Sequence, residues 1–243
     1  MASVTLLDGS TRDVALPVEV RRADAIVVSW VVDAGVAADV LAGHAPTVGA
    51  LEPVPMLRGR TMVSMPFVRY LDGDLGAYNE LGLAFVVRRP GDDEVASFIA
   101  HLPVDGAFTC AAGRQLWGFP KLVADELTIA HGPTGARVRL DTGEGSVVTA
   151  EVRPGRLPLP ARTMRLTTYA AADGELRATP FTMRSAGLRA RPGGTTITAE
   201  GDGPLAADLR ALGLPGRRPV STLWVSHLTG TFATAQPVGA RAG

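Results

Sequence analysis

Short segments of β-branched and apolar residues recur along the whole chain, separated by turns rich in glycine and proline. The clearest of them, residues 25–32 (Ala-Ile-Val-Val-Ser-Trp-Val-Val), is apolar on both faces and predicts a buried strand. The 28 glycines and 18 prolines are spread along the chain rather than gathered in one linker. Numerous short strands usually close on themselves, because closure removes the unpaired backbone groups of edge strands. The pattern therefore favours a mostly antiparallel β domain.

Two or three short helices are expected beside the strands, which makes the predicted fold class α+β. Asp33 suits the N-cap of a first helix that ends near Gly43, and this leaves His44 in the following loop. Further helices are expected over 104–116 and 204–212. The remaining strands are expected at 61–70, 78–89, 95–101, 126–131, 136–140, 146–152, 164–169, 177–184, 195–200 and 220–232.

The composition sets limits on the organisation and the partners of the chain. No linker or repeat divides residues 1–243, so a single domain is expected. The formal net charge is zero, which argues against a nucleic-acid partner because such proteins need a basic face. Cys110 is the only cysteine, so no internal disulfide is possible and a cytoplasmic location is the simplest expectation. The most apolar stretch, 25–41, is interrupted by Asp33 and Asp39, so we expect no membrane span.

Recognisable metal and cofactor motifs are missing from the sequence. The four histidines, His44, His101, His131 and His227, are far apart, and none has a second ligand at the spacing typical of metal sites. The glycine patterns of phosphate-binding loops and of dinucleotide-binding folds do not occur. We therefore predict neither a metal nor a cofactor.

Lys121 is the only lysine among 24 basic residues, and the other 23 are arginines. Lysine can lose its proton when it is buried, whereas arginine remains charged. Trp117 and Phe119 place apolar surface beside Lys121, and Pro120 prevents a helix from continuing through it. A neutral amine in a dry pocket can attack a carbonyl group and form a Schiff base. The sole lysine is therefore the strongest candidate for a catalytic residue.

Three segments resemble motifs of the acetoacetate decarboxylase family. Residues 113–121, Gly-Arg-Gln-Leu-Trp-Gly-Phe-Pro-Lys, resemble the motif that carries the family's Schiff-base lysine. Residues 76–80, Gly-Ala-Tyr-Asn-Glu, resemble its Gly-x-Tyr-x-Glu segment, and 220–227 resemble its closing Ser-x-Ser-His strand. The resemblance spans most of the chain. It implies a closed, cone-like β barrel, a homo-oligomer and a small keto acid substrate.

The resemblance also implies roles for individual residues. Lys121 would be the nucleophile and Glu80 an acid/base, although Glu80 alone also suits an exposed strand glutamate or a partner for an arginine. Arg21 or Arg22 would meet the substrate carboxylate, unless both are simply exposed at the start of a strand. Met65 stands where the family has a second acidic residue, and this would make room for a more apolar substrate. The further substrate-binding candidates are Trp117 and Phe119.

Two further departures from the family pattern, together with Met65, leave the reaction open. Leu122 follows Lys121 where typical members carry a second lysine, so apolar burial alone would have to lower the pKa of Lys121. Gln115 replaces the motif glutamate. The first hypothesis is a lyase that decarboxylates a small β-keto acid. The second is an aldolase-dehydratase that uses the same imine on pyruvate-like 2-oxo acids and aldehydes, and the third is a non-catalytic barrel that binds an apolar ligand.

Overall fold

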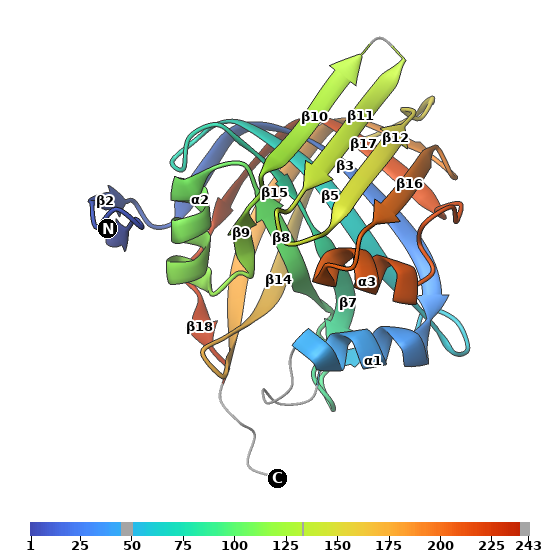
Figure 1. Cartoon of the computed structure of the whole chain (residues 1–243), viewed down its shortest axis with the longest axis horizontal. Helices are drawn as coiled ribbons and strands as arrows, with labels where there is room; N and C mark the ends of the chain where they lie inside the picture. The colour runs from blue at the N-terminus through green and yellow to red at the C-terminus, as the bar shows by residue number, and fades with distance from the viewer. Residues whose placement is uncertain (45–50, 133, 239–243) are drawn as a thin grey trace.

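The computed structural model describes residues 1–44, 51–132 and 134–238, and it consists mostly of antiparallel strands with three short α-helices (Figure 1). The α+β prediction is therefore confirmed. In the largest sheet the order is β13-β15-β17-β3-β5-β6-β8-β7-β4, and β14 pairs with both β15 and β8. The closed, cone-like form of this sheet stays a prediction. In this order, the strands are β13 (Leu157–Leu159), β15 (Glu175–Arg191), β17 (Ser221–Phe232), β3 (Val18–Asp33), β5 (Arg60–Gly73), β6 (Tyr78–Leu81), β8 (Ala96–Val104), β7 (Leu83–Arg88) and β4 (Glu52–Pro53). Three further strands pair with members of this series: β14 (Arg162–Ala172), β18 (Gln236–Pro237) and β9 (Lys121–Val123).

Strand β3 is longer than predicted and runs through the middle of the large sheet, between β17 and β5. The segment predicted as one strand at 78–89 forms two strands, β6 and β7, which are separated by Gly82. A Cβ atom at Gly82 would lie 2.9 Å from Cγ of Pro66, so only glycine allows the two segments to approach this closely. The break leaves Glu80 on the short strand β6, beside β5.

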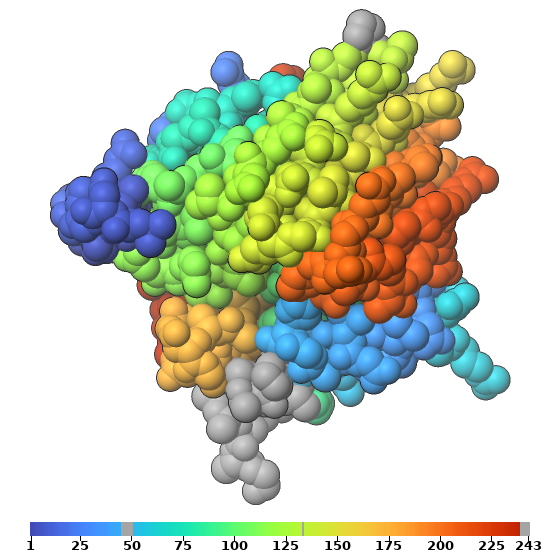
Figure 2. All heavy atoms as spheres, viewed as in Figure 1, coloured from blue at the N-terminus to red at the C-terminus, as the bar shows by residue number. Residues whose placement is uncertain are grey.

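Helix α1 (Ala34–His44) begins as the sequence predicts. The Asp33 carboxylate accepts hydrogen bonds from the backbone N–H groups of Gly35 at 2.9 Å and Val36 at 3.2 Å. His44 is the last residue of this helix, so its predicted position in a loop is wrong. Helix α3 (Pro204–Ala211) starts at the predicted proline. The two helices lie side by side over one part of the large sheet (Figures 1 and 2).

The segment that leads to Lys121 is not the single helix that was predicted over 104–116. Val104 ends strand β8, and α2 (Ala107–Ala112) then continues as a π-helical turn over Gly113–Trp117. The turn ends at Gly118, whose φ of 70° is left-handed and favours glycine. Strand β9 follows and runs parallel to β8, with Lys121 opposite Leu102. The prediction that Lys121 lies on an extended segment is therefore confirmed.

Two smaller sheets complete the described residues. A four-stranded antiparallel sheet contains β10 (Glu126–Gly132), β11 (Gly135–Asp141), β12 (Val147–Val152) and β16 (Thr195–Glu200). Its inward side chains, such as Leu140 and Ile197, join the main hydrophobic core. The hairpin of β1 (Ala2–Thr5) and β2 (Thr11–Val14) projects beside α2 (Figure 1). Among the described residues, none of the helices has the length and the apolar character that crossing a membrane requires.

Candidate active site

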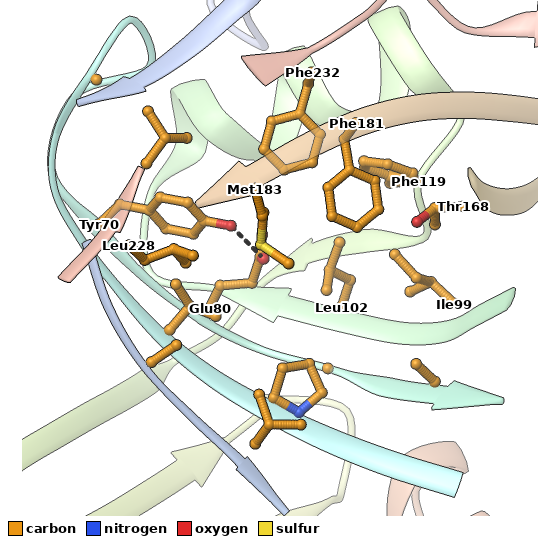
Figure 3. Close-up of a pocket in the computed structure, with 18 of the residues that line it drawn as sticks. Tyr70, Glu80, Ile99, Leu102, Phe119, Thr168, Phe181, Met183, Leu228 and Phe232 are labelled. Atoms are coloured by element: carbon orange, nitrogen blue, oxygen red, sulfur yellow. Dashed lines mark hydrogen bonds between the residues drawn. The ribbon is translucent and has the colours of Figure 1, made fainter. Parts of the chain in front are cut away.

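The large sheet encloses a cavity of about 210 Å³ with mostly apolar walls (Figure 3). Phe119, Phe181 and Phe232 line it together with Leu102 and Ile99. The charged residues of its lining are Glu19, Glu80, Lys121 and Arg162; Glu19 and Arg162 are solvent-exposed, whereas Glu80 and Lys121 are buried. The buried charges of the cavity are therefore the two residues that the lysine and glutamate motifs single out.

Lys121 and Glu80 form an ion pair inside this cavity. The distance from Nζ of Lys121 to Oε2 of Glu80 is 2.8 Å, and their side chains are 3% and 11% exposed. Nζ also donates a hydrogen bond to Oγ1 of Thr109 at 3.0 Å and lies 4.9 Å from the centre of the Tyr78 ring. Strand β9 thus supplies the amine, and helix α2 and strand β6 supply the groups that hold it.

Two tyrosines surround the Glu80 carboxylate. The Tyr70 hydroxyl donates a hydrogen bond to Oε1 of Glu80 at 3.1 Å (Figure 3). Tyr70 and Tyr78 are register partners on β5 and β6, and their rings stack at 4.3 Å. Burial, followed by the charge of Glu80, raises the pKa of Tyr70 well above its ordinary value. Tyr70 therefore remains a hydrogen-bond donor and holds one oxygen of Glu80 while the other faces Lys121.

The pKa of Lys121 is raised, contrary to the expectation that apolar burial lowers it. Burial is the largest single influence on this pKa and favours the neutral amine. The charge of Glu80, the charge of Tyr78 and the hydrogen bond to Glu80 together outweigh burial. The free protein therefore holds Lys121 as an ammonium group. The carboxylate of Glu80, 2.8 Å away, lies within reach of this proton.

Gly113, the first residue of the lysine motif, makes room for the lysine itself. A Cβ atom at this position would lie 2.4 Å from Cδ and 2.7 Å from Cε of Lys121. Both distances are far below ordinary van der Waals contact, so a larger residue would displace the lysine side chain. The glycine is thus explained by close packing and not by its backbone angles, which are those of a right-handed helix.

We expect the substitution Gly113→Ala to leave the chain folded and to reduce imine formation at least tenfold, because the new methyl group moves Nζ away from Glu80. The measurement is the rate of borohydride trapping with a keto acid, with circular dichroism as a check of folding. Gly132→Ala is the matched control, since a Cβ atom there meets nothing closer than 3.7 Å. Equal trapping rates in both variants would contradict this account of Gly113.

The structure places some predicted substrate-binding residues at the cavity and others elsewhere. Trp117 and Phe119 line it. Met65 is fully buried in the main core and is not among the lining residues, because alternation along β5 directs Pro66, Val68 and Tyr70 to the cavity instead.

Arg21 and Arg22 also lie outside the lining. Arg21 pairs with Asp72 at 3.0 Å and Asp74 at 2.6 Å on the surface. Arg22 is exposed at an irregularity in the pairing of β3 with β5. Val18 and Val20 line the cavity before this irregularity and Ala25 and Val27 after it, so the alternation changes there and Arg22 does not enter.

Sequence reasoning did not assign Tyr70, Tyr78, Thr109 and Arg162 to the site. For Tyr78 a signal exists, because it precedes Glu80 by two residues and so shares its face of β6. The position of Tyr70 depends on the register of β5 with β6. Thr109 and Arg162 come from elements whose approach to the cavity no local pattern indicates.

Comparison with known proteins identifies the family of the chain. The family model described as acetoacetate decarboxylase matches residues 7–231. The chain therefore belongs to the acetoacetate decarboxylase family, as its motifs suggest. Members of this family are lyases. No curated protein matches the sequence.

Solved structures with the same fold have low sequence identity to the chain. Acetoacetate decarboxylase from Legionella pneumophila is 18% identical, with a TM-score of 0.67 over 93% of this chain and 88% of that one. The enduracididine biosynthesis enzyme MppR complexed with pyruvate is 14% identical, with a TM-score of 0.61 over 100% of both chains. An acetoacetate decarboxylase-like enzyme from Sphingomonas wittichii is 17% identical, with a TM-score of 0.54 over 94% of this chain and 95% of that one.

Proposed function

We propose that the protein is a Schiff-base lyase that decarboxylates a β-keto acid with an apolar chain. The observation that carries this proposal is the buried contact of 2.8 Å between Lys121 and Glu80 in a cavity with mostly apolar walls. A purely ligand-binding cavity for apolar molecules gains nothing from two buried charges, because removing them from water costs several kcal/mol per ion. A catalytic role explains why the ion pair is buried in this cavity.

In the proposed reaction, Glu80 first accepts a proton from Lys121. The neutral amine attacks the ketone carbon, and the resulting carbinolamine loses its hydroxyl group as water, with the proton supplied by Glu80. The bond between the α-carbon and the carboxylate of the protonated imine then breaks, and its electron pair moves toward the nitrogen. Carbon dioxide leaves and an enamine remains. Protonation of the enamine carbon and addition of water release the ketone and restore Lys121.

The apolar walls favour loss of the carboxylate. A carboxylate enclosed by aromatic and aliphatic side chains lacks the solvation it has in water, whereas the departing carbon dioxide is neutral and needs none. Phe119 and Phe232 belong to this lining, and Arg162 is its only arginine among the described residues and is solvent-exposed. The cavity therefore favours a substrate that loses its carboxylate during the reaction over one that keeps it.

The aldolase-dehydratase is the second hypothesis, because its enamine forms on the same lysine. The solved structure of MppR with pyruvate has the same fold as this chain. A pyruvate carboxylate is attached directly to the imine carbon and stays there throughout the reaction. Beside Lys121 it would meet Glu80, Tyr78 and apolar side chains rather than an arginine. For this reason we rank decarboxylation first. A homo-oligomer remains a prediction from the family resemblance, and a cytoplasmic location remains a prediction from the single cysteine.

The substrate is expected to be longer than acetoacetate. Each additional buried methylene group contributes about 0.8 kcal/mol, or roughly a fourfold gain in kcat/KM when the gain is realised in the transition state. We expect carbon dioxide release to become faster from 3-oxobutanoate through 3-oxohexanoate to 3-oxooctanoate, until the cavity of about 210 Å³ is filled. The measurement is carbon dioxide release under steady-state conditions.

Ile99→Trp provides a control for this series, because Ile99 lines the cavity away from Tyr70 and Glu80 (Figure 3). We expect this variant to lose activity on the long acids and to retain activity on 3-oxobutanoate. Condensation of pyruvate with aldehydes, combined with no carbon dioxide release from any of the 3-oxo acids, would instead establish the aldolase hypothesis.

A further inference from the structure

A second group of polar side chains lies outside the candidate active site and comes from three separate elements. His44 ends helix α1, His101 lies on strand β8 and Asp208 lies on helix α3. Nε2 of His44 is 2.6 Å and Nε2 of His101 is 2.7 Å from the same oxygen, Oδ2 of Asp208. The two imidazole rings meet edge to face with their centres 4.7 Å apart. One potential ligand atom from each residue lies within 4.8 Å of the others.

An irregularity in β8 directs His101 away from the cavity. His101 pairs with Leu83 and Ile99 pairs with Ala84, so Ala100 is an extra residue between two successive pairs. Ile99 and Leu102 line the cavity, while Ala100 packs in the main core. His101 is therefore on the opposite face of β8, where α1 and α3 lie side by side (Figures 1 and 2). His44, His101 and Asp208 are far apart in the sequence, and tertiary packing brings the three elements that carry them together.

We propose that His44, His101 and Asp208 form a binding site for a divalent transition metal ion, with Zn²⁺ as the first candidate. Two imidazole nitrogens and one carboxylate oxygen are a ligand set that zinc accepts, with a water molecule as a fourth ligand. The side chains of His44 and Asp208 are 23% and 21% exposed, so the site is open to an ion and to water. The side chain of His101 is 9% exposed, so the residues packed around it restrict the movement of its ring.

Zinc binding would change the distances between the three ligand atoms. Ligand atoms around a tetrahedral zinc ion are about 3.3 Å apart when each bond is about 2.0–2.1 Å. The present N–O distances of 2.6 and 2.7 Å are those of hydrogen bonds. The ion would replace the protons of these hydrogen bonds, and each nitrogen would move away from the shared oxygen by well under 1 Å. The two nitrogen atoms, which now lie within 4.8 Å of each other, would have to approach to about the same 3.3 Å spacing, which rotation of the imidazole rings can provide.

The test is zinc titration of the full chain, without a histidine tag and after treatment with a chelator. We expect one Zn²⁺ per chain by isothermal titration calorimetry and a higher melting temperature in its presence, because the ion binds the folded state and joins α1, α3 and β8. Co²⁺ in place of Zn²⁺ should give the visible absorption of a tetrahedral nitrogen and oxygen site. His44→Gln, His101→Gln and Asp208→Asn should each weaken binding at least tenfold.

His131→Gln is the matched control, because His131 is a partly buried histidine 3.6 Å from Asp24, and the described part of the chain offers this pair no third ligand. This variant should bind zinc like the parent chain. If His101→Gln fails to fold, His44→Gln at the helix end still provides the comparison, since its side chain is more exposed. Absence of stoichiometric zinc binding by the parent chain would show that the three side chains only join α1, α3 and β8 through hydrogen bonds. Equal affinity in the parent chain, His44→Gln and Asp208→Asn would place the ion elsewhere; either outcome overturns the proposal.

Discussion

Replacing Lys121 with arginine is expected to abolish covalent capture of keto acids and to lower kcat/KM for decarboxylation at least ~10³-fold, equivalent to about 4 kcal/mol of transition-state stabilisation. Arginine keeps a positive charge beside Glu80, so the buried carboxylate keeps a partner. It cannot lose its proton to become a nucleophile. The substitution therefore separates the structural role of the charge from the chemical role of the amine.

The measurement is borohydride trapping followed by mass spectrometry of the intact chain and of its peptides. Lys121 is the only lysine, so the N-terminal amine is the only other primary amine that can be trapped. In the parent chain we expect a reduced adduct on the Lys121 peptide, and in Lys121→Arg none. Lys121→Met is a second variant of similar length without charge, in case arginine does not fit. Carbon dioxide release by a folded Lys121→Arg protein within tenfold of the parent rate would refute the Schiff-base mechanism.

The substitution Glu80→Gln is expected to have two opposite effects, which different measurements separate. Glu80 raises the pKa of Lys121, whereas burial lowers it. Removing the carboxylate charge leaves burial as the main influence, so the pKa of Lys121 falls and the neutral amine exists at lower pH. The chain also loses its proton acceptor and donor, which is expected to lower kcat by roughly 10²-fold or more.

These effects appear in the pH dependence. In the parent chain, direct amine attack increases as pH rises toward the raised pKa of Lys121, because deprotonation provides the nucleophile. In Glu80→Gln the midpoint of borohydride trapping should move to lower pH, while carbon dioxide release slows at every pH. Glu19→Gln is the matched control, since Glu19 lines the same cavity but is exposed. An unchanged trapping midpoint in Glu80→Gln would mean that Glu80 does not set the charge state of Lys121.

Local features of the fold could be predicted from the sequence because they depend on neighbouring residues. Alternation and β-branched segments predict most strands, and Asp33 predicts the start of α1 through its side-chain hydrogen bonds. Pro120 predicts the extended conformation of Lys121. The sole lysine and its motif indicate the family and the candidate reactive amine without any structure.

Which side chains contact one another depends on the tertiary structure. The 2.8 Å contact between Lys121 and Glu80 and the hydrogen bond from Tyr70 depend on pairings between strands that are distant in sequence. Irregular pairing in β3 keeps Arg22 out of the cavity, and an extra residue in β8 directs His101 to Asp208. A single inserted residue reverses the face of every side chain that follows it, and no local pattern reveals where the insertion occurs. The sequence therefore determined which residue is the candidate amine, Lys121, whereas the long-range register of the sheet determined its charge state and its neighbours.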